Sequence, residues 1–287
     1  MRQIPNKIIV SCDKYPTLDN PDKIVYSCCS EVIELSEENK VYKMRYRDMD
    51  VIQSNDLIRA YQDDFTLLET KIIRLAIAQI FQNDTDFKTY TCNVIDLAEV
   101  LKLDRYTIYK EMDTLTTDLL RKVIKIEEQP QSGKKKNWKK FHWVDYAEYN
   151  NGTLTLRLSE SLKPYLLNLF SLYTQYDYRE IISLPTYNSI RLAELIFSFK
   201  NMGVNQKSKK VFEIECNSNE YVFNIEYLRK YFNCEDKYKR TSDFIRRVIN
   251  PSVEGMNTNG YNITYRIVKE NRIPTHIVFN YRVIGRK

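Results

Sequence analysis

Residues 226–249 read EYLRKYFNCEDKYKRTSDFIRRVI, and this stretch has the pattern of a helix-turn-helix. We expect a short helix over Glu226–Phe232, a turn over Asn233–Asp236 and a longer helix over Lys237–Ile249, because Asn and Asp favour turns over helix interiors. Asn250-Pro251 follows, and we expect a new helical turn to start there, since proline is tolerated at a first helical position but not inside a helix.

The segments around this unit complete a winged helix. An apolar helix is expected over Ser189–Lys200 and a short strand over Tyr221–Ile225. Alternating residues predict two more strands, Tyr261–Val268 and Thr275–Val283, which pair across a turn at 269–272. A helix-turn-helix closed by such a hairpin has the element order of a winged helix, so we predict one over residues 173–287.

The same order of elements occurs earlier in the chain. Apolar periodicity predicts helices over 66–82, 96–103, 105–121 and 162–173, and alternation predicts strands over 90–94, 123–126, 140–144 and 153–158. We therefore predict a first winged-helix domain over residues 51–172. Residues 1–50, with strand candidates at 24–26 and 41–44, form an N-terminal extension of open role. The predicted fold class is α+β, with two tandem winged-helix domains.

The basic charge of the chain is concentrated in its last part. The whole chain has 44 Lys and Arg against 38 Asp and Glu, a net charge of +6. Residues 173–287 contain 19 basic and 12 acidic residues, whereas residues 51–172 contain 17 of each. Clustered cations favour a polyanionic partner, because they displace the counterions condensed on phosphates. A merely solubilising surface would have the same charge.

The composition disfavours most enzyme classes and gives no sign of a metal or cofactor. The glycine motifs of nucleotide-binding loops and the GxSxG of hydrolases are absent, and none of the six cysteines forms a CxxC pair. A rolling-circle nicking enzyme needs a His-rich metal site, and the two histidines, His142 and His276, lie far apart. No apolar run approaches the roughly 18 residues of a membrane helix and no secretory signal is evident, so we expect a cytoplasmic protein with no membrane partner.

The longer helix of the second unit has one polar face. With Phe244 at the centre of the buried side, a spacing of 100° per residue puts Val248 beside it and polar residues opposite. Such residues can read base edges in the major groove of double-stranded DNA, although an ordinary solvated face looks the same. If the helix begins only at Thr241, Lys239 leaves this face and becomes a phosphate contact. The expected DNA contacts of this domain are Lys237, Lys239, Arg240, Ser242, Arg246, Arg247, Asn250, Lys269 and Arg272.

The first unit has a weaker DNA-binding face. Opposite Ile108 of its longer helix lie Tyr106, Lys110, Asp113 and Thr117, a set with only one cation. We expect this domain to serve assembly more than base reading, with accessory DNA contacts from its basic loop at Lys134, Lys135 and Lys136. The 22 tyrosines also permit a stacking platform for single strands, but many fall at helix ends, where a half-buried ring with a wet hydroxyl fits.

Several stretches, taken in order, resemble the theta-type plasmid replication initiators, the iteron-binding Rep proteins. They are SNDLI at 54–58, TLLETK at 66–71, DLAEVL at 96–101, YTQY at 173–176, SIRLAEL at 189–195 and FIRRVI at 244–249. Two local departures are LPT at 184–186, where the family pattern has a basic segment, and EGMN at 254–257, where a glycine replaces an apolar residue.

The resemblance implies two winged-helix domains and a non-enzymatic initiator. Monomers would bind direct repeats at a plasmid origin, open it, and recruit the host replication initiator and helicase. Homodimers, joined through the first domain, would bind an inverted-repeat operator and repress their own gene. Lys239, Ser242 and Arg246 would be the main base readers. Without the resemblance, a winged-helix transcription regulator with no replication role fits equally well, whereas a pure protein-interaction module leaves the basic C-terminal part unexplained.

Neutralising Lys134, Lys135 and Lys136 tests the basic loop of the first domain. We expect the slope of log affinity against log salt concentration to fall by about 0.9 for each lost phosphate contact. Titration of duplex DNA at several salt concentrations measures that slope. An unchanged slope would remove the loop from the interface.

Overall fold

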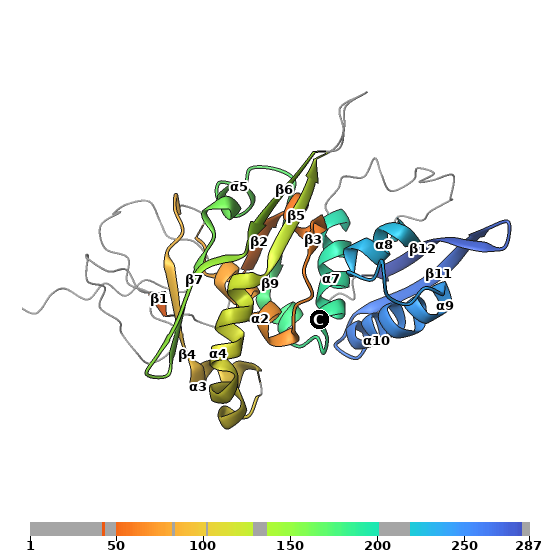
Figure 1. Cartoon of the computed structure of the whole chain (residues 1–287). Coiled ribbons are helices and arrows are strands. Elements are labelled where there is room, and N and C mark those ends of the chain that lie inside the picture. Colours follow the sequence, from red (N-terminus) through yellow and green to blue (C-terminus); the bar gives the residue numbers. More distant parts are fainter. Residues whose placement is uncertain are drawn as a thin grey trace, which may run out of the picture. The chain divides into compact units, whose positions relative to one another are not determined.

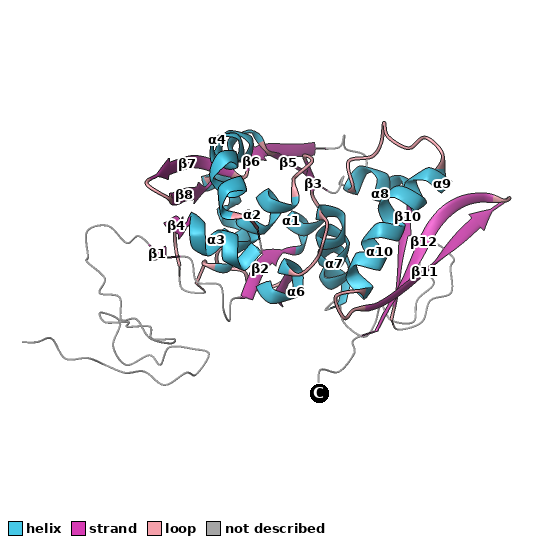
Figure 2. Ribbon diagram, turned by 90° about the horizontal axis from the view of Figure 1, so that it is seen from below, coloured by secondary structure: helices cyan, strands magenta, loops and turns pink. Residues whose placement is uncertain are grey.

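The computed structural model describes residues 42–43, 50–81, 84–101, 103–128, 137–200 and 219–282, which Figures 1 and 2 show from two directions. The strand expected at 24–26 and the loop lysines 134–136 lie outside these residues. Of the strand expected at 41–44, Tyr42–Lys43 forms β1. Within the described ranges no helix has both the length and the apolar character needed to cross a bilayer.

Three longer helices of the first winged helix follow the predicted pattern. They are α2 (Leu67–Ala78), α3 (Val94–Leu101) and α4 (Arg105–Arg121), preceded by the short α1 (Asn55–Arg59). Thr66 and Glu69 cap α2 reciprocally, each side chain accepting a hydrogen bond from the other residue's backbone N–H. The prediction that α2 extends to residue 82 is wrong, because the N–H of Gln79 turns back to the carbonyl of Ala76 and closes the helix.

Two sheets complete the first winged helix. The larger has the order β1-β4-β8-β7, where β4 is Thr89–Asn93, β7 is Val144–Asn150 and β8 is Thr153–Leu158. The smaller joins β3 (Tyr61–Gln62), β5 (Val123–Glu128) and β6 (Asn137–His142), so β5 and β6 form the predicted hairpin. The strand expected at 140–144 is divided at Trp143, which is fully buried and separates β6 from β7.

The segment after β8 differs from the prediction of a single helix over 162–173. A 3₁₀ turn (Glu160–Leu162) and α5 (Lys163–Leu166) are followed by Asn168 and Leu172 with φ of 53° and 54°, a conformation that interrupts any helix. Tyr173–Asp177 then forms β9, which pairs antiparallel with β2 (Asp50–Ser54) over five residues. The expected domain boundary at 172/173 therefore falls directly before a strand that is hydrogen-bonded to the start of the first domain.

Two helices, α6 (Tyr178–Ile182) and α7 (Tyr187–Lys200), lead into the second winged helix. Its elements are β10 (Glu220–Asn224), α8 (Ile225–Tyr231), α9 (Thr241–Phe244), the π-helical turn η3 (Ile245–Ile249), α10 (Asn250–Asn257), β11 (Asn262–Glu270) and β12 (Ile273–Arg282). The antiparallel order β10-β12-β11 places the long hairpin of Figure 1 at one side of these helices, as a wing. The two-domain α+β prediction is confirmed.

The longer helix of this unit differs in two details from the prediction. It begins at Thr241 and not at Lys237, because Tyr238 has a φ of 53°, which ends helical continuity before it. It also continues without a break through Asn250-Pro251. The N–H of Asn250 bonds to the carbonyl of Ile245, five residues back, so the wider π turn directly precedes a proline that has no N–H to donate.

Gly255 in α10 makes a close helix packing possible. A Cβ at this position would lie 2.7 Å from Oγ of Ser189 and 2.8 Å from Cγ of Pro185, both next to or within α7. Figure 2 shows α7 and α10 side by side. The two departures from the family pattern, LPT and EGMN, are therefore complementary: proline and glycine meet where bulkier residues would collide.

A buried ion pair joins α2 to α7. The guanidinium of Arg74 donates to both carboxylate oxygens of Glu194, at 2.6 and 2.9 Å, and both side chains are almost fully buried. The hydroxyl of Tyr176 on β9 and the amide of Gln53 on β2 also donate to Glu194. Residues more than 100 positions apart in sequence thus satisfy one carboxylate.

Arg191 extends this network to the second winged helix. Its guanidinium donates to the carbonyls of Ile58 and Ala60 at 3.0 and 2.9 Å, and it lies 4.0 Å from the ring centroid of Tyr231 in α8. The hydroxyl of Tyr231 in turn donates to the carbonyl of Arg191. Helix α7 is therefore fastened on one side to α1 and α2 and on the other to α8.

Replacing Glu194 with Gln should destabilise the protein by about 3–5 kcal/mol, because Arg74 would be left buried without its counter-charge. Urea unfolding followed by circular dichroism measures the loss. The control is Asp145→Asn, which breaks the partly exposed Arg157–Asp145 pair and should cause a much smaller loss. Equal losses for the two variants would contradict this account.

The carboxylate of Glu194 makes the stability of the folded protein depend on pH. Burial alone would raise the pKa of Glu194, but the charges of Arg74 and Arg191 and the hydrogen bonds from Arg74 and Tyr176 hold it below its ordinary value. A lowered folded-state pKa gives stabilisation that is complete above the unfolded pKa of about 4.3 and is lost as the pH falls through the folded-state pKa. In Glu194→Gln, this part of the acid destabilisation should be missing.

Candidate nucleic-acid interface

The continuous helix from α9 to α10 exposes a polar face and buries an apolar one. Phe244, Val248 and Ile249 are buried, whereas Arg246 and Arg247 are both exposed. The π turn separates these sets, because its wider spacing lets two adjacent residues point inward and two adjacent arginines point outward. The exposed face also includes Ser242, Asn250, Glu254, Asn257 and Thr258.

Arg246 is the expected base reader that the structure exposes most clearly. Its side chain is 68% exposed, and its guanidinium contacts the carboxylate of Asp243, one turn earlier, at 2.9 Å. This contact engages one terminal nitrogen and restricts the rotamer of the long side chain. The contact uses one nitrogen of this largely exposed guanidinium, and its other donors can bind a guanine edge or a phosphate.

Residues before the helix hold its start in place. Arg229 of α8 donates to the carbonyls of Lys237 and Tyr238 at 3.2 and 2.9 Å, and its guanidinium lies 4.9 Å from the ring of buried Phe244. The guanidinium of Arg247 lies 5.7 Å from the ring of Tyr238. Arg229 therefore supports the turn, a role that the sequence pattern did not reveal, because it depends on backbone carbonyls eight and nine residues away.

Three of the expected DNA contacts, Lys237, Lys239 and Arg240, lie in this turn and have different surroundings. The ammonium of Lys237 is 2.6 Å from the carboxylate of Asp64, which precedes α2, so this residue contacts the first domain. Lys239 and Arg240 are exposed, and Arg240 is the N-cap residue of α9 without a side-chain cap bond. Because the helix begins at Thr241, Lys239 lies off its face, and its role as a phosphate contact in place of a base reader stays a prediction.

The wing presents the other expected cations of the second domain. Lys269 and Arg272 are exposed at the end of the β11–β12 hairpin. Asn271 and Arg272 have φ of 49° and 69°, as in the two-residue turns whose twist matches a β-hairpin. Ile273 beside them is 66% exposed, so the wing end combines cations with an apolar side chain.

The first domain shows a mixed surface on α4. Tyr106, Lys110 and Asp113 are exposed and Thr117 is partly buried, as the helical spacing predicts. On β6, Lys139 and Lys140 are exposed, and the ammonium of Lys140 lies 5.2 Å from the ring of Trp138. These residues belong to α4 and β6 of the first domain, so any DNA contact they make would be in addition to those of the α9–α10 face.

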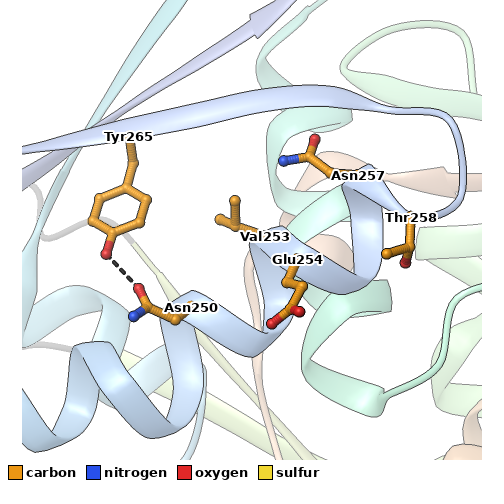
Figure 3. A pocket seen from close by; sticks show the side chains of 6 residues that line it. All are labelled: Asn250, Val253, Glu254, Asn257, Thr258 and Tyr265. Atoms are coloured by element: carbon orange, nitrogen blue, oxygen red, sulfur yellow. Dashed lines mark hydrogen bonds between the residues drawn. The ribbon is translucent and has the colours of Figure 1, made fainter.

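A shallow groove lies between α10 and the wing strand β11, and Figure 3 shows its lining. The hydroxyl of Tyr265 on β11 donates to Oδ1 of Asn250, the last of the expected base readers. Glu254 lies one turn further along the same face. Tyr265 is not among the residues that the sequence predicts to contact DNA, although its place in the alternation of a predicted strand puts it on the same side as buried Ile263. The groove is lined by Asn250, Val253, Glu254, Asn257, Thr258 and Tyr265.

Family models and a curated relative both connect this chain with replication initiation proteins. A family model described as Initiator Replication protein, WH1, matches residues 50–197, and one described as Initiator Rep protein, WH2, matches residues 224–281. A curated Escherichia coli protein named Replication initiation protein is 24% identical over 234 residues, which are 80% of this chain and 68% of that protein.

A solved structure shares the fold. The crystal structure of Pi initiator protein in complex with iteron DNA is 16% identical, with a TM-score of 0.63, over 84% of this chain and 99% of the Pi chain. The WH1 match reaches residue 197 and so includes β9 and most of α7, in agreement with their packing against β2 and α2. The resemblance found in the sequence is confirmed, and the chain belongs to the family of Rep-type plasmid replication initiator proteins, with one WH1 and one WH2 domain.

Proposed function

We propose that this protein starts plasmid replication by binding repeated double-stranded DNA sites at its own origin, in the cytoplasm and without catalysing a reaction. The observation that carries this proposal is the exposed face of α9–α10, where Arg246 and Arg247 project beside Ser242 and Asn250. The Pi initiator, which has the same fold, was crystallised with iteron DNA and supports the same class of ligand.

The exposed groups divide naturally into two kinds of DNA contact. Arg246, Ser242 and Asn250 lie on the helix that would enter the major groove. There an arginine can pair with O6 and N7 of guanine, and serine and asparagine side chains can form hydrogen bonds with base edges. Lys239, Arg240, Lys269 and Arg272 flank that helix in the turn and the wing, where they would neutralise phosphates. The first kind gives sequence preference and the second gives salt-dependent affinity.

The proposal includes a dimer formed through the first domain. Strand β7 is at the edge of its sheet, and its residues Tyr146 and Tyr149 are each 40% exposed. An edge strand with exposed aromatic side chains can pair with a second copy. Repression of its own gene by this dimer, origin opening, and recruitment of the host initiator and helicase follow from family resemblance and belong to the same proposal.

Binding to duplexes from the protein's own replicon is the direct test. The proposal predicts about a thousandfold or greater preference for the direct repeats over scrambled DNA, with one additional shifted band for each repeat. Equal, salt-sensitive binding to every duplex would contradict it. Replication of an origin-less plasmid supplied with this gene and its origin then separates an initiator from a transcription regulator, which would bind DNA but support no replication.

Arg246→Ala should weaken binding to the cognate repeat by about 1–3 kcal/mol and relax the preference at one base pair. The reason is that a bidentate guanine contact is lost while the phosphate contacts remain. Competition binding against all single-base variants of the repeat measures both effects. Arg157→Ala, which removes an arginine also paired with an aspartate but located on β8, serves as the control and should leave binding unchanged. Equal weakening on every sequence would restrict Arg246 to phosphate contact.

A further inference from the structure

The groove beside α10 contains a side-chain arrangement that bears on base choice. Asn257 makes two hydrogen bonds to the backbone of Ile263, donating from Nδ2 to the carbonyl at 2.8 Å and accepting at Oδ1 from the N–H at 2.9 Å. These bonds fix the register of β11 relative to the helix. Tyr265 lies two residues after Ile263, on the same side of the strand, and Asn250 lies seven residues, about two helical turns, before Asn257. Tyr265 and Asn250 therefore point into the same groove (Figure 3).

The phenol of Tyr265 is positioned to donate to Asn250. Its ring packs against the fully buried ring of Phe279 with centroids 6.1 Å apart, and its hydroxyl donates to Oδ1 of Asn250. Burial raises the pKa of Tyr265, so the hydroxyl carries its proton at neutral pH. Asn250 itself is exposed, and its Nδ2 is the amide atom directed away from Tyr265 in Figure 3.

An asparagine held in this way has lost part of its usual recognition capacity. Pairing with adenine uses both amide atoms at once, because Oδ1 accepts from N6–H while Nδ2 donates to N7. Here Oδ1 is turned toward the wing strand, and the two N–H groups of Nδ2 remain. They suit guanine best, because guanine presents two neighbouring acceptors in the major groove, O6 and N7, whereas adenine presents N7 beside an N6–H2 donor and thymine presents O4 alone.

The charge of the groove supports contact with bases and not with the backbone. Glu254 lines the groove one turn beyond Asn250, and its carboxylate would repel a phosphate. The arginines and lysines of the interface lie toward the start of the helix and in the wing end. Asn250 is therefore at the boundary where cationic contacts end and neutral hydrogen bonding begins.

We propose that Tyr265 is a specificity-determining residue: by holding Oδ1 of Asn250, it makes this position favour guanine over adenine. The inference rests on the proposed function, because it requires the α9–α10 helix to lie in the major groove. Tyr265 acts here as a positioning residue and need not touch DNA itself.

The test compares base preferences of four full-length proteins: wild type, Asn250→Ala, Tyr265→Phe and Tyr221→Phe. Tyr221 is a matched control, because it pairs with Phe279 from the opposite neighbouring strand, β10, as Tyr265 does from β11. Binding to every single-base variant of the protein's own repeat is measured for each, together with thermal unfolding.

The four proteins should differ in their preference at one base pair, the one that Asn250 contacts. Wild type and Tyr221→Phe should prefer guanine there by about fivefold or more over adenine. Asn250→Ala should lose the preference at that pair alone, and Tyr265→Phe should bring adenine to equal or better affinity, with the other positions unchanged.

Two results would overturn the inference while leaving the proposed function intact. In one, Tyr265→Phe keeps the wild-type profile at the position that Asn250→Ala affects. In the other, Asn250→Ala changes no single position. If the wild type itself shows no sequence preference, the proposed function fails and the inference fails with it.

Discussion

The Arg74–Glu194 ion pair is the contact on which the rest of the structure depends. It lies in the core, where an unpaired charge would cost several kcal/mol, so the elements that carry and surround it must assemble together. Through Gln53 and Tyr176 it includes β2 and β9, and through Arg191 it reaches α1 and α8. Helix α7 belongs to the first domain by its buried charges, yet α10 packs against it and Tyr231 of α8 contacts its Arg191.

This arrangement explains how the DNA-binding face is supported. Gly255 lets α10 approach Pro185 and Ser189 closely, Tyr231 fastens α8 to Arg191, and Arg229 holds the turn before α9. None of these residues is expected to contact DNA. They position a helix whose exposed arginines are themselves restrained, Arg246 by Asp243 and Arg247 by Tyr238. Restrained side chains lose less conformational entropy on binding, which favours affinity.

Local patterns in the sequence were sufficient to predict most elements, including the whole of α4 and the helix-turn-helix of each domain. They failed where a long-range contact decides the conformation. Tyr173–Asp177 has no strong strand pattern of its own and becomes a strand because β2, more than 100 residues earlier, pairs with it. The π turn before Pro251 and the positive φ of Tyr238 likewise depend on packing that helical periodicity does not encode. Helical periodicity predicted Arg246, whereas strand alternation predicts only the side on which Tyr265 lies, and its contact with Asn250 depends on β11 lying beside α10.

The central claim is that the exposed face of α9–α10 reads bases in the major groove of repeated DNA. Chemical probing of guanine N7 with dimethyl sulfate, on a duplex bearing one repeat with and without the protein, tests it most directly, because N7 is accessible in the major groove alone. The account predicts strong protection of guanines within the repeat, lost at one position in Arg246→Ala. A duplex that is fully bound by the protein while every guanine N7 of the repeat stays reactive would contradict it.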